Sequence, residues 1–487
     1  MAVAVDQAHG FKSLARPLRC KRKSSSKVDY EMLDISQSEL TQSLEHAFNF
    51  TYIHKSFSTP CLSHSSRPED DSATNPRIEI IVGHDAPQIH AMVVEVAVAM
   101  ASGIKPEPVS SGLGGAYFLR AKNGDKIAVA KPVDEEPLAF NNPKGYTGRM
   151  MGQPGMKSSI RIGETGLRES AAYLLDHGGF AGVPPTALVE FFHVQFNSNS
   201  SGSNSSPPYK TASLQRFVDH DSDAGDIGPS TFSVTDVHRI GILDIRLMNL
   251  DRHAGNILVR QQNDSYGRGD AELVPIDHGY CLPESLDDPY FEWLHWPQAS
   301  IPFSETEVDY VSRLDPYKDA ELLRTELPSI RESSIRVLMI CTIFLKQATA
   351  YGLCLADMGE MMTREFNGGE ENWSALENLC MIAKARLNNR LSDDNVINSD
   401  HDEDDIDIML HYNQDSDAPR VFHDPPAKGG LMSPVANYNL DGAGISFGDM
   451  DNDEWESFLI IFEKLLSKAF EERTSMGLSN QRFGSSC

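Results

Sequence analysis

The sequence predicts an α+β fold, because strand-like and helix-like segments alternate through its globular part, residues 104–395. Short apolar runs at 127–130 and 273–276 are typical of β-strands, as is the run at 78–82 just ahead of this part. The segments 86–102 and 164–176 fit helices instead, and the second carries its apolar residues along one stripe.

The flanking regions have a different composition. Residues 1–75 are rich in Ser, Thr and Pro and are predicted to be disordered; their basic stretch, 12–27, is either a solvated tail or a site for anionic lipid or an import receptor. Residues 197–208 are predicted to be a loop inserted into the globular domain. The acidic segment 396–450 is predicted to be a disordered linker, either solvated or docking a protein partner.

A C-terminal amphipathic helix is predicted at 453–473, where large apolar residues recur at helical spacing. This apolar face either packs on the folded body or binds a partner groove or a membrane surface. The apolar residues are Trp455, Phe458, Leu459, Phe462, Leu465, Leu466 and Phe470.

Charge and composition exclude several classes of protein. The net charge of -27 would repel nucleic acid, so no nucleic-acid partner is expected. No run of about 18 apolar residues predicts a transmembrane segment, and no apolar signal-peptide core is found near the start. The 7 cysteines include no Cys-x-x-Cys pair, which favours an intracellular location: cytoplasmic or peripheral to a membrane, with the nucleus as an alternative.

The motif that carries most chemistry is Asp251-Arg252-His253-Ala254-Gly255-Asn256, which leads into an apolar strand. In kinases an Asp and an Asn at this spacing form the catalytic loop: the Asp orients the attacking hydroxyl and the Asn holds Mg²⁺. His253 is placed to neutralise the phosphoryl group. An ordinary polar turn is the alternative.

A second motif supports the kinase interpretation. The strand-like segment 273–276 ends at Asp277, and a hairpin-like stretch separates it from Asn256. Two neighbouring strands would then deliver Asn256 and Asp277 to one metal ion that bridges the phosphates of ATP. Gly279 is expected to let the backbone turn after the metal ligand.

The other half of a nucleotide site is expected upstream. A glycine-rich loop whose amides could approach phosphate oxygens runs into a strand, and its residues are Ser111, Gly112, Leu113, Gly114, Gly115, Ala116 and Tyr117. Lys131 ends the following hairpin, where kinases place the lysine that holds the α and β phosphates.

Two assignments depend on position alone. The acidic partner of Lys131 should come from the helix at 164–176, where Glu164 lies near the apolar stripe and Glu169 lies away from it. The segment 213–218 is expected to connect two lobes and to contact adenine through its backbone, at Gln215, Arg216, Phe217 and Val218.

The order of residues within these motifs is similar to that of one family. Protein kinases place His-Arg before the catalytic Asp, whereas Asp251-Arg252-His253 has the order of phosphatidylinositol 3- and 4-kinases. Residues 130–137, 168–176 and 249–256 resemble the gamma-type phosphatidylinositol 4-kinases of plants, and the similarity covers roughly 104–395. This resemblance favours Glu169 as the partner of Lys131.

The resemblance implies a bilobal, protein-kinase-like α+β fold, with an antiparallel sheet and a helix in the N-lobe and a largely helical C-lobe. It implies transfer of the ATP γ-phosphate to the 4-hydroxyl of phosphatidylinositol at a membrane surface. Asp251 would orient the hydroxyl, His253 and Lys131 would stabilise phosphate charge, and Asn256 and Asp277 would hold Mg²⁺, with Mn²⁺ as an alternative. A serine/threonine protein kinase acting on a protein hydroxyl, and a weakly active scaffold that binds partners through the acidic linker and C-terminal helix, are the competing hypotheses.

The segment 278–312 bears on the substrate. It contains no Lys or Arg, which argues against inositol lipids that already carry extra phosphates. Its apolar cluster, Phe291, Trp293, Leu294 and Trp296, is either a membrane-facing wedge or part of the core or substrate cleft.

Overall fold

The computed structural model describes residues 2–4, 76–83, 86–196, 209–261, 271–367, 370–393 and 444–483. The basic stretch 12–27, the inserted loop 197–208 and residues 396–443 of the acidic linker lie outside the described residues. The chain divides into two compact units. The first comprises Met1–Asp236, Ala254–Cys281 and Glu321–Ile330, and the second comprises Val237–His253, Leu282–Ala320 and Arg331–Cys487.

The first unit is built on a seven-stranded sheet in which every neighbouring pair is antiparallel. The strand order is β1-β2-β6-β7-β5-β4-β3. The strands are β1 (Ala2–Ala4), β2 (Arg77–Val82), β3 (Glu107–Pro108), β4 (Tyr117–Arg120), β5 (Lys126–Pro132), β6 (Thr186–Phe192) and β7 (Tyr209–Arg216). The strands expected at 78–82 and 127–130 are confirmed.

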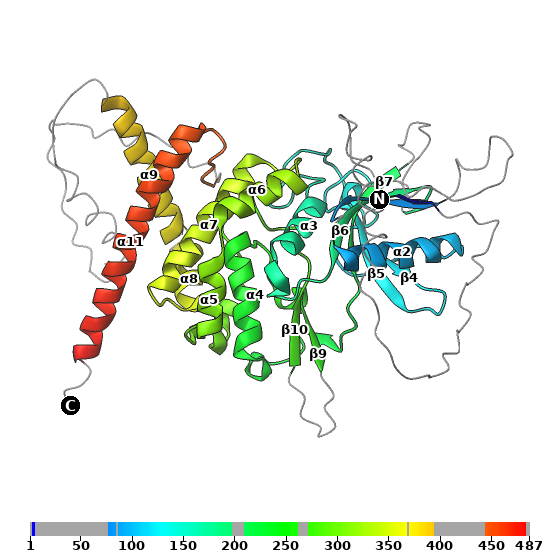
Figure 1. The fold of residues 1–487 in the computed structure, drawn as a ribbon, viewed down its shortest axis with the longest axis horizontal. Coiled ribbons are helices and arrows are strands. Elements are labelled where there is room, and N and C mark those ends of the chain that lie inside the picture. Colours follow the sequence, from blue (N-terminus) through cyan, green and yellow to red (C-terminus); the bar gives the residue numbers. More distant parts are fainter. Residues whose placement is uncertain are drawn as a thin grey trace, which may run out of the picture. The chain divides into compact units, whose positions relative to one another are not determined.

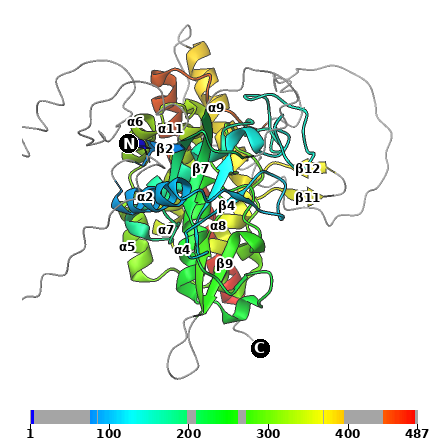
Figure 2. The same cartoon turned by 90° about the vertical axis from the view of Figure 1, so that its right-hand side faces the viewer.

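One helix covers each face of this sheet. Helix α2 (Pro87–Ala101) packs its apolar residues on β2, β4 and β5 to form the core of the unit (Figures 1 and 2). Helix α3 (Thr165–Leu175) contacts β6 and β7, with Gly166 so close to Leu188 that a Cβ there would lie 3.2 Å from the Leu188 Cδ1 atom. Both predicted helices are confirmed. Since side chains alternate along a strand, Ala130 enters the α2 core and Lys131 points to the other face.

The start of the folded domain differs from the expected residue 104. Strand β2 pairs with β6, and α2 supplies much of the core, so the domain begins no later than Arg77. Within the segment expected to be disordered, Ala2–Ala4 forms a strand that pairs with β2. Sequence periodicity could not reveal these pairings because they join distant parts of the chain.

A small three-stranded sheet carries the predicted metal ligands of the first unit. It has the order β10-β9-β8, with β8 (Ser222–Asp223), β9 (Ile257–Gln261) and β10 (Ala271–Pro275), all antiparallel. The expected neighbouring strands after Asn256 and before Asp277 are therefore confirmed. Short 3₁₀ turns in this unit are η2 (Val133–Glu135), η3 (His177–Gly179), η4 (Pro229–Thr231) and η5 (Ala254–Asn256).

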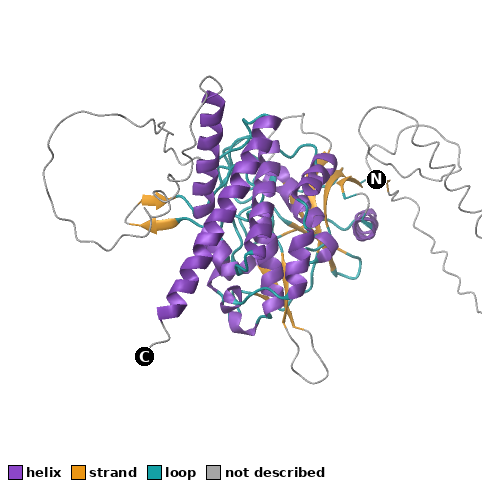
Figure 3. Ribbon diagram, turned by 60° about the vertical axis from the view of Figure 1, so that its left-hand side comes forward, coloured by secondary structure: helices purple, strands orange, loops and turns teal. Residues whose placement is uncertain are grey.

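The second unit is largely helical, which agrees with the predicted fold class. Helix α7 (Glu332–Ala350) contacts α5 and α11, and α11 also packs on α9 (Figures 1 and 3). The other elements are α4 (Val234–Leu247), α5 (Glu305–Arg313), α8 (Leu355–Met362), α9 (Ala375–Asp393), α11 (Asn452–Phe483), η6 (Glu292–His295) and η7 (Pro297–Ser300). Strands β11 (Glu365–Asn367) and β12 (Glu370–Asn372) form a hairpin (Figure 2). Helix α6 spans Pro316–Glu326, and the division between the two units falls within it.

The C-terminal helix is longer than predicted, and the seven apolar residues that defined its predicted face, from Trp455 to Phe470, are all buried. Packing on the folded body is confirmed, and the alternative of an apolar face open to a membrane is wrong. The expected linker also ends early: Ile445 and Phe447 are buried, and the Arg336 Nη1 atom donates to the Phe447 carbonyl at 2.7 Å. Residues 444–450 therefore belong to the fold.

The cluster at 291–296 is part of the core. Phe291, Trp293 and Trp296 are buried, and the Phe291 and Trp293 rings stack with centroids 4.6 Å apart. A membrane-facing wedge is excluded for these rings. Of the helices that the structure describes, none has an apolar stretch of the length needed to cross a bilayer.

Candidate active site

Three charged side chains from separate elements of the first unit meet at one point. The Lys131 Nζ atom, at the end of β5, lies 2.6 Å from Glu169 Oε1 on α3 and 2.9 Å from Asp277 Oδ1 after β10. Glu164 pairs instead with Arg168, at 2.9 Å. The structure thus selects Glu169, and it brings Lys131 and Asp277 together as a kinase site requires.

The electrostatics of this cluster favour the charged forms of Lys131 and Asp277. Burial alone would lower the pKa of Lys131, but the charges of Asp277 and Glu169 outweigh it and raise that pKa above its ordinary value. Burial acts to raise the pKa of Asp277, yet attraction to Lys131 and its hydrogen bond hold the pKa below the ordinary value. Burial raises the pKa of Glu169, although Lys131 opposes the shift. The Asp277 side chain is 47% exposed, so its carboxylate is accessible to a metal ion.

The backbone turns at Asp277 itself. Its φ angle of 56° lies in the left-handed region, which Asp tolerates better than most residues. The expected turn at Gly279 follows directly, because the Cys281 amide donates to the His278 carbonyl at 3.3 Å around it. Gly279 also permits close packing, since a Cβ there would lie 3.0 Å from the Thr165 Cβ atom. Glu169 also fixes this turn, because its Oε2 atom accepts the His278 amide at 3.2 Å. Strain of this kind is typical of functional sites.

Asn256 lies at the same end of the β9–β10 hairpin as Asp277. Its side chain is buried, and its carbonyl accepts the Ile276 amide at 3.0 Å, which continues the ladder toward Asp277. Among the described residues no cluster of three His, Cys, Asp or Glu side chains forms a protein-only metal cage. One carboxylate and one amide oxygen fit the usual pattern for a divalent ion whose remaining ligands are substrate phosphates and water.

The glycine loop runs into strand β4, as predicted, and it follows the short strand β3, but Gly115 has a structural role. Its amide donates to the Glu135 carbonyl at 2.8 Å, so this amide is not directed at phosphate. A Cβ on Gly115 would overlap the Glu135 side chain. Tyr117 is buried, and its hydroxyl donates to Glu135 Oε2 at 2.6 Å. Contacts with phosphate therefore remain a prediction for Ser111, Gly112, Leu113, Gly114 and Ala116.

The expected lobe connection at 213–218 begins later. Residues up to Arg216 belong to β7, where Gln215 donates to Thr186 Oγ1 at 2.9 Å and Arg216 pairs with Glu95 at 2.7 Å. Only Phe217 and Val218 follow the strand, and the Phe217 amide donates to the Ile127 carbonyl at 2.9 Å. The side chains of Gln215 and Arg216 thus hold the strand in place, which their position in the sequence did not indicate.

In the second unit, a buried carboxylate fixes the catalytic-loop motif. Asp244 on α4 accepts Arg252 Nε at 2.9 and 3.1 Å, Asn249 Nδ2 at 2.9 Å and Trp293 Nε1 at 3.0 Å. Asp244 and Arg252 are both fully buried. Arg252 is thereby immobilised, and its chain neighbours Asp251 and His253 are half-buried and exposed, respectively.

Comparison with known proteins agrees with these motifs. The model of the phosphatidylinositol 3- and 4-kinase family matches residues 112–358. The chain belongs to this family. Its relatives include two Arabidopsis thaliana proteins named phosphatidylinositol 4-kinase gamma 1 and gamma 8, each 48% identical over all of this chain and over 96% and 100% of their own lengths. Another from the same plant, gamma 7, is 56% identical over 70% of this chain and 53% of its own length. The family that the motifs predicted is confirmed.

Two features of this family member were missed from the sequence. Asp244 follows Ile242 and Leu243 in an apolar stretch of α4, and a lone acid at such a position is the signal that could have identified it. Lys144 and Asn142 brace the glycine loop: Lys144 Nζ donates to the Ser110 and Gly112 carbonyls at 3.3 and 3.0 Å, and Asn142 Nδ2 to the Leu113 carbonyl at 2.8 Å. No motif marks them.

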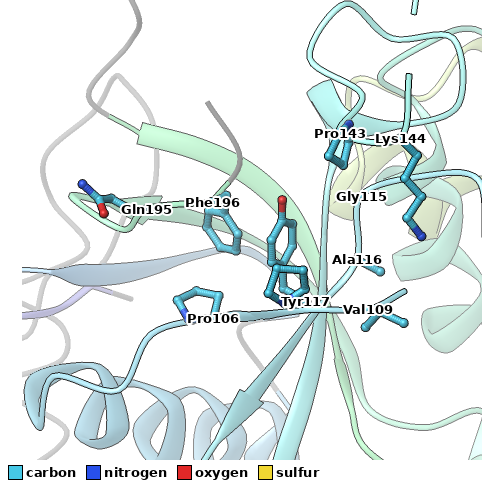
Figure 4. A pocket seen from close by; sticks show the side chains of 10 residues that line it. Pro106, Val109, Gly115, Ala116, Tyr117, Pro143, Lys144, Gln195 and Phe196 are labelled. Atoms are coloured by element: carbon cyan, nitrogen blue, oxygen red, sulfur yellow. The ribbon is translucent and has the colours of Figure 1, made fainter. Parts of the chain in front are cut away.

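A pocket of about 380 Å³ borders the end of the glycine loop. Tyr117 and Phe196 lie along one part of it and Pro143 and Lys144 along another (Figure 4). Because Lys131, Glu169 and Asp277 do not line it, this pocket is separate from the charged cluster around Lys131.

Proposed function

We propose that this member of the family transfers the γ-phosphate of ATP to the 4-hydroxyl of phosphatidylinositol. The observation that carries the proposal is the Lys131–Glu169–Asp277 cluster, with contacts of 2.6 and 2.9 Å around one ammonium group. Glu169 holds the lysine, and the lysine can hold phosphate oxygens only when such a partner positions it. The names of the full-length relatives support the choice of phosphatidylinositol and of its 4-hydroxyl.

The residues of the first unit would hold the nucleotide. Lys131 would keep its contact with Glu169 and exchange Asp277 for the α and β phosphates, because Asp277 is then occupied by the metal ion. Asp277 and Asn256 would bind that ion. Two protein oxygen ligands suit Mg²⁺, which takes its remaining ligands from water and phosphate, and they do not suit ions that prefer nitrogen or sulfur. Mn²⁺ is expected to substitute for Mg²⁺.

The residues of the second unit would act on the lipid hydroxyl. Asp251 would orient the hydroxyl and accept its proton, and His253 would stabilise the transferred phosphoryl group. Arg252 would keep both neighbours in place, because Asp244 holds its guanidinium. Asp244 and Arg252 are therefore positioning residues.

The absence of basic residues from 278–312 favours an unphosphorylated inositol ring. A ring that already bears phosphates would need cationic partners, whereas this segment carries acids such as Glu284, Asp287 and Glu292. The proposed substrate is therefore phosphatidylinositol itself. An intracellular location is proposed as well, which the free thiols of Cys341 and Cys380 suit.

The test is transfer of radiolabel from ATP to phosphatidylinositol vesicles and, in parallel, to a generic protein substrate. Label in the lipid that disappears in Asp277→Ala is the expected result. Label in protein alone would replace the lipid assignment by a protein kinase. Binding of ATP without transfer to either acceptor would favour a scaffold and would overturn the proposed activity.

A further inference from the structure

The segment between η2 and α3 has a charge unlike that of the rest of the chain. Residues 137–163 contain no Asp or Glu, whereas Lys144, Arg149, Lys157 and Arg161 are basic. The chain as a whole has a net charge of -27. This segment therefore has a net positive charge without any acidic residue, although anionic surfaces would repel the protein as a whole.

The same segment exposes large apolar side chains. Phe140 is 73% exposed and Met150 is 72% exposed, the two highest values for large apolar side chains among the described residues. Tyr146, Met151 and Met156 are each more than half exposed. Exposed large apolar side chains that are concentrated in one ordered segment point to an interaction site. We call residues 137–163 with these side chains the basic-apolar loop.

The basic-apolar loop is held by its own backbone, so the exposure is a fixed feature of the fold. The Leu138 amide donates to the Tyr146 carbonyl at 2.8 Å, and the Gly155 amide donates to the Ile160 carbonyl at 2.7 Å. Ile160 and Ile162 are buried and anchor the loop. The same ordered loop therefore has buried apolar side chains that anchor it and exposed apolar side chains that face solvent.

We propose that the basic-apolar loop docks on a bilayer containing anionic phospholipid. Aromatic and Met side chains would enter the interface between headgroups and acyl chains, and Arg149 and Lys157 would meet the negative headgroups. The carbonyl groups bonded by Arg149 do not neutralise its charge. The other candidate membrane surfaces that the structure describes, the rings of 291–296 and the apolar face of α11, are buried.

This inference rests on the proposed function, because a kinase of a membrane lipid must meet the bilayer, and it names the surface that does so. The loop is also coupled to the glycine loop of the first unit. Lys144 reaches from the loop to the Gly112 carbonyl at 3.0 Å, beside the residues at the end of the glycine loop (Figure 4). Glu136, next to the loop, accepts the Gly163 amide at 2.7 Å. Docking would therefore occur beside the glycine loop.

The test is flotation of the full chain with vesicles of phosphatidylcholine alone or with added phosphatidylserine. Wild type is expected to float with the anionic vesicles. Phe140→Ser/Met150→Ser should lower the partition coefficient at least about tenfold, since two apolar anchors are removed. Its matched control is Val98→Ser/Ile460→Ser, which removes two exposed apolar side chains elsewhere and should leave binding unchanged.

The charge is tested by Arg149→Glu/Lys157→Glu, which should abolish the preference for phosphatidylserine, with Lys105→Glu/Lys122→Glu as the matched control. Equal flotation of the loop variants and wild type would overturn the proposal. So would failure of wild type to bind either vesicle, in which case the loop would be a surface for a protein partner.

A soluble short-chain phosphatidylinositol separates this inference from the proposed function. Loop variants should phosphorylate it at the wild-type rate and lose activity only on vesicles. No phosphorylation of the soluble lipid by wild type would refute the lipid-kinase proposal, while flotation would still decide whether the loop binds membranes.

Discussion

Replacement of Asp244 with alanine should lower the free energy of unfolding of the second unit by about 3–5 kcal/mol. Asp244 and Arg252 are both fully buried, and the carboxylate accepts the guanidinium at 2.9 and 3.1 Å. Loss of the carboxylate leaves a buried positive charge uncompensated and removes the acceptor of Asn249 and Trp293. The measured cost of breaking one partner of a buried pair gives this magnitude.

Urea unfolding followed by tryptophan fluorescence measures the effect in the relevant unit. All 4 tryptophans, at 293, 296, 373 and 455, belong to the second unit, so the signal does not report on the sheet of the first. With a slope of about 2–3 kcal/mol per M, the unfolding midpoint should fall by about 1–2.5 M. The variant should also lose phosphotransfer, because Arg252 positions Asp251 and His253.

The control is Asp309→Ala, which breaks the exposed i,i+4 pair with Arg313 in the same unit. That change should cost only about 0.5 kcal/mol. Combining Asp244→Ala with Arg252→Met should recover part of the loss, since the uncompensated charge is then absent. If Asp244→Ala moved the midpoint no further than Asp309→Ala does, the reasoning about this buried pair would be refuted.

Three further predictions concern the first unit. Glu169→Gln should lower kcat/KM for ATP about 100-fold in a steady-state assay, because its lysine loses a charged partner and its orientation. Gly115→Ala should raise the KM for ATP about tenfold, since the added carbon overlaps the Glu135 side chain and displaces the glycine loop. Burial raises the pKa of Glu136 from 4.5 to about 7. The folded state therefore binds the Glu136 proton more tightly than the unfolded state does, so the free energy of unfolding should fall as pH rises from 4.5 through 7. Amide hydrogen exchange of β5 and α3 as a function of pH measures this dependence, and Glu136→Gln should flatten it.

These predictions have matched controls. The control for Glu169→Gln is Glu164→Gln, which changes a neighbouring acid that pairs with Arg168. It should alter kcat/KM for ATP less than about threefold if Glu169 alone positions Lys131. Gly228→Ala adds a carbon where nothing lies within 4 Å, so it should leave the KM for ATP unchanged. Equal effects in a variant and its control, or an unaltered pH slope in Glu136→Gln, would contradict the corresponding argument.

Local spacing predicted the parts of the site that lie on short segments. Lys131 near the end of a strand, Asn256 just before β9 and Asp277 just after β10 follow from hairpins that are nearly continuous in sequence. Their chemistry requires fixed residue types at fixed positions, so the sequence contains most of the information. The mixed fold class could be predicted for the same reason.

The parts that failed depend on the environment that the fold creates. The position of Glu169 away from the apolar stripe of its helix suggests a solvated side chain, and this expectation is wrong. Arg168, Glu169 and Ser170 are all buried, so α3 has no solvated face at this point. The pairing of β2 with β6, and the role of Asp244, require segments that are far apart in the chain to meet. No periodicity within a single window can contain that information.

The place of α11 determines when the second unit can close during synthesis. Phe470 packs on Phe344 and Tyr351 of earlier segments, with ring centroids 5.9 and 5.5 Å apart. Phe344 and Tyr351 leave the ribosome well before Phe470 of α11 has been translated, and a chaperone would have to shield the two rings in the interval. A premature stop codon or a proteolytic cut ahead of residue 444 would make that interval permanent and leave the apolar sides of α7 and α9 open to aggregation.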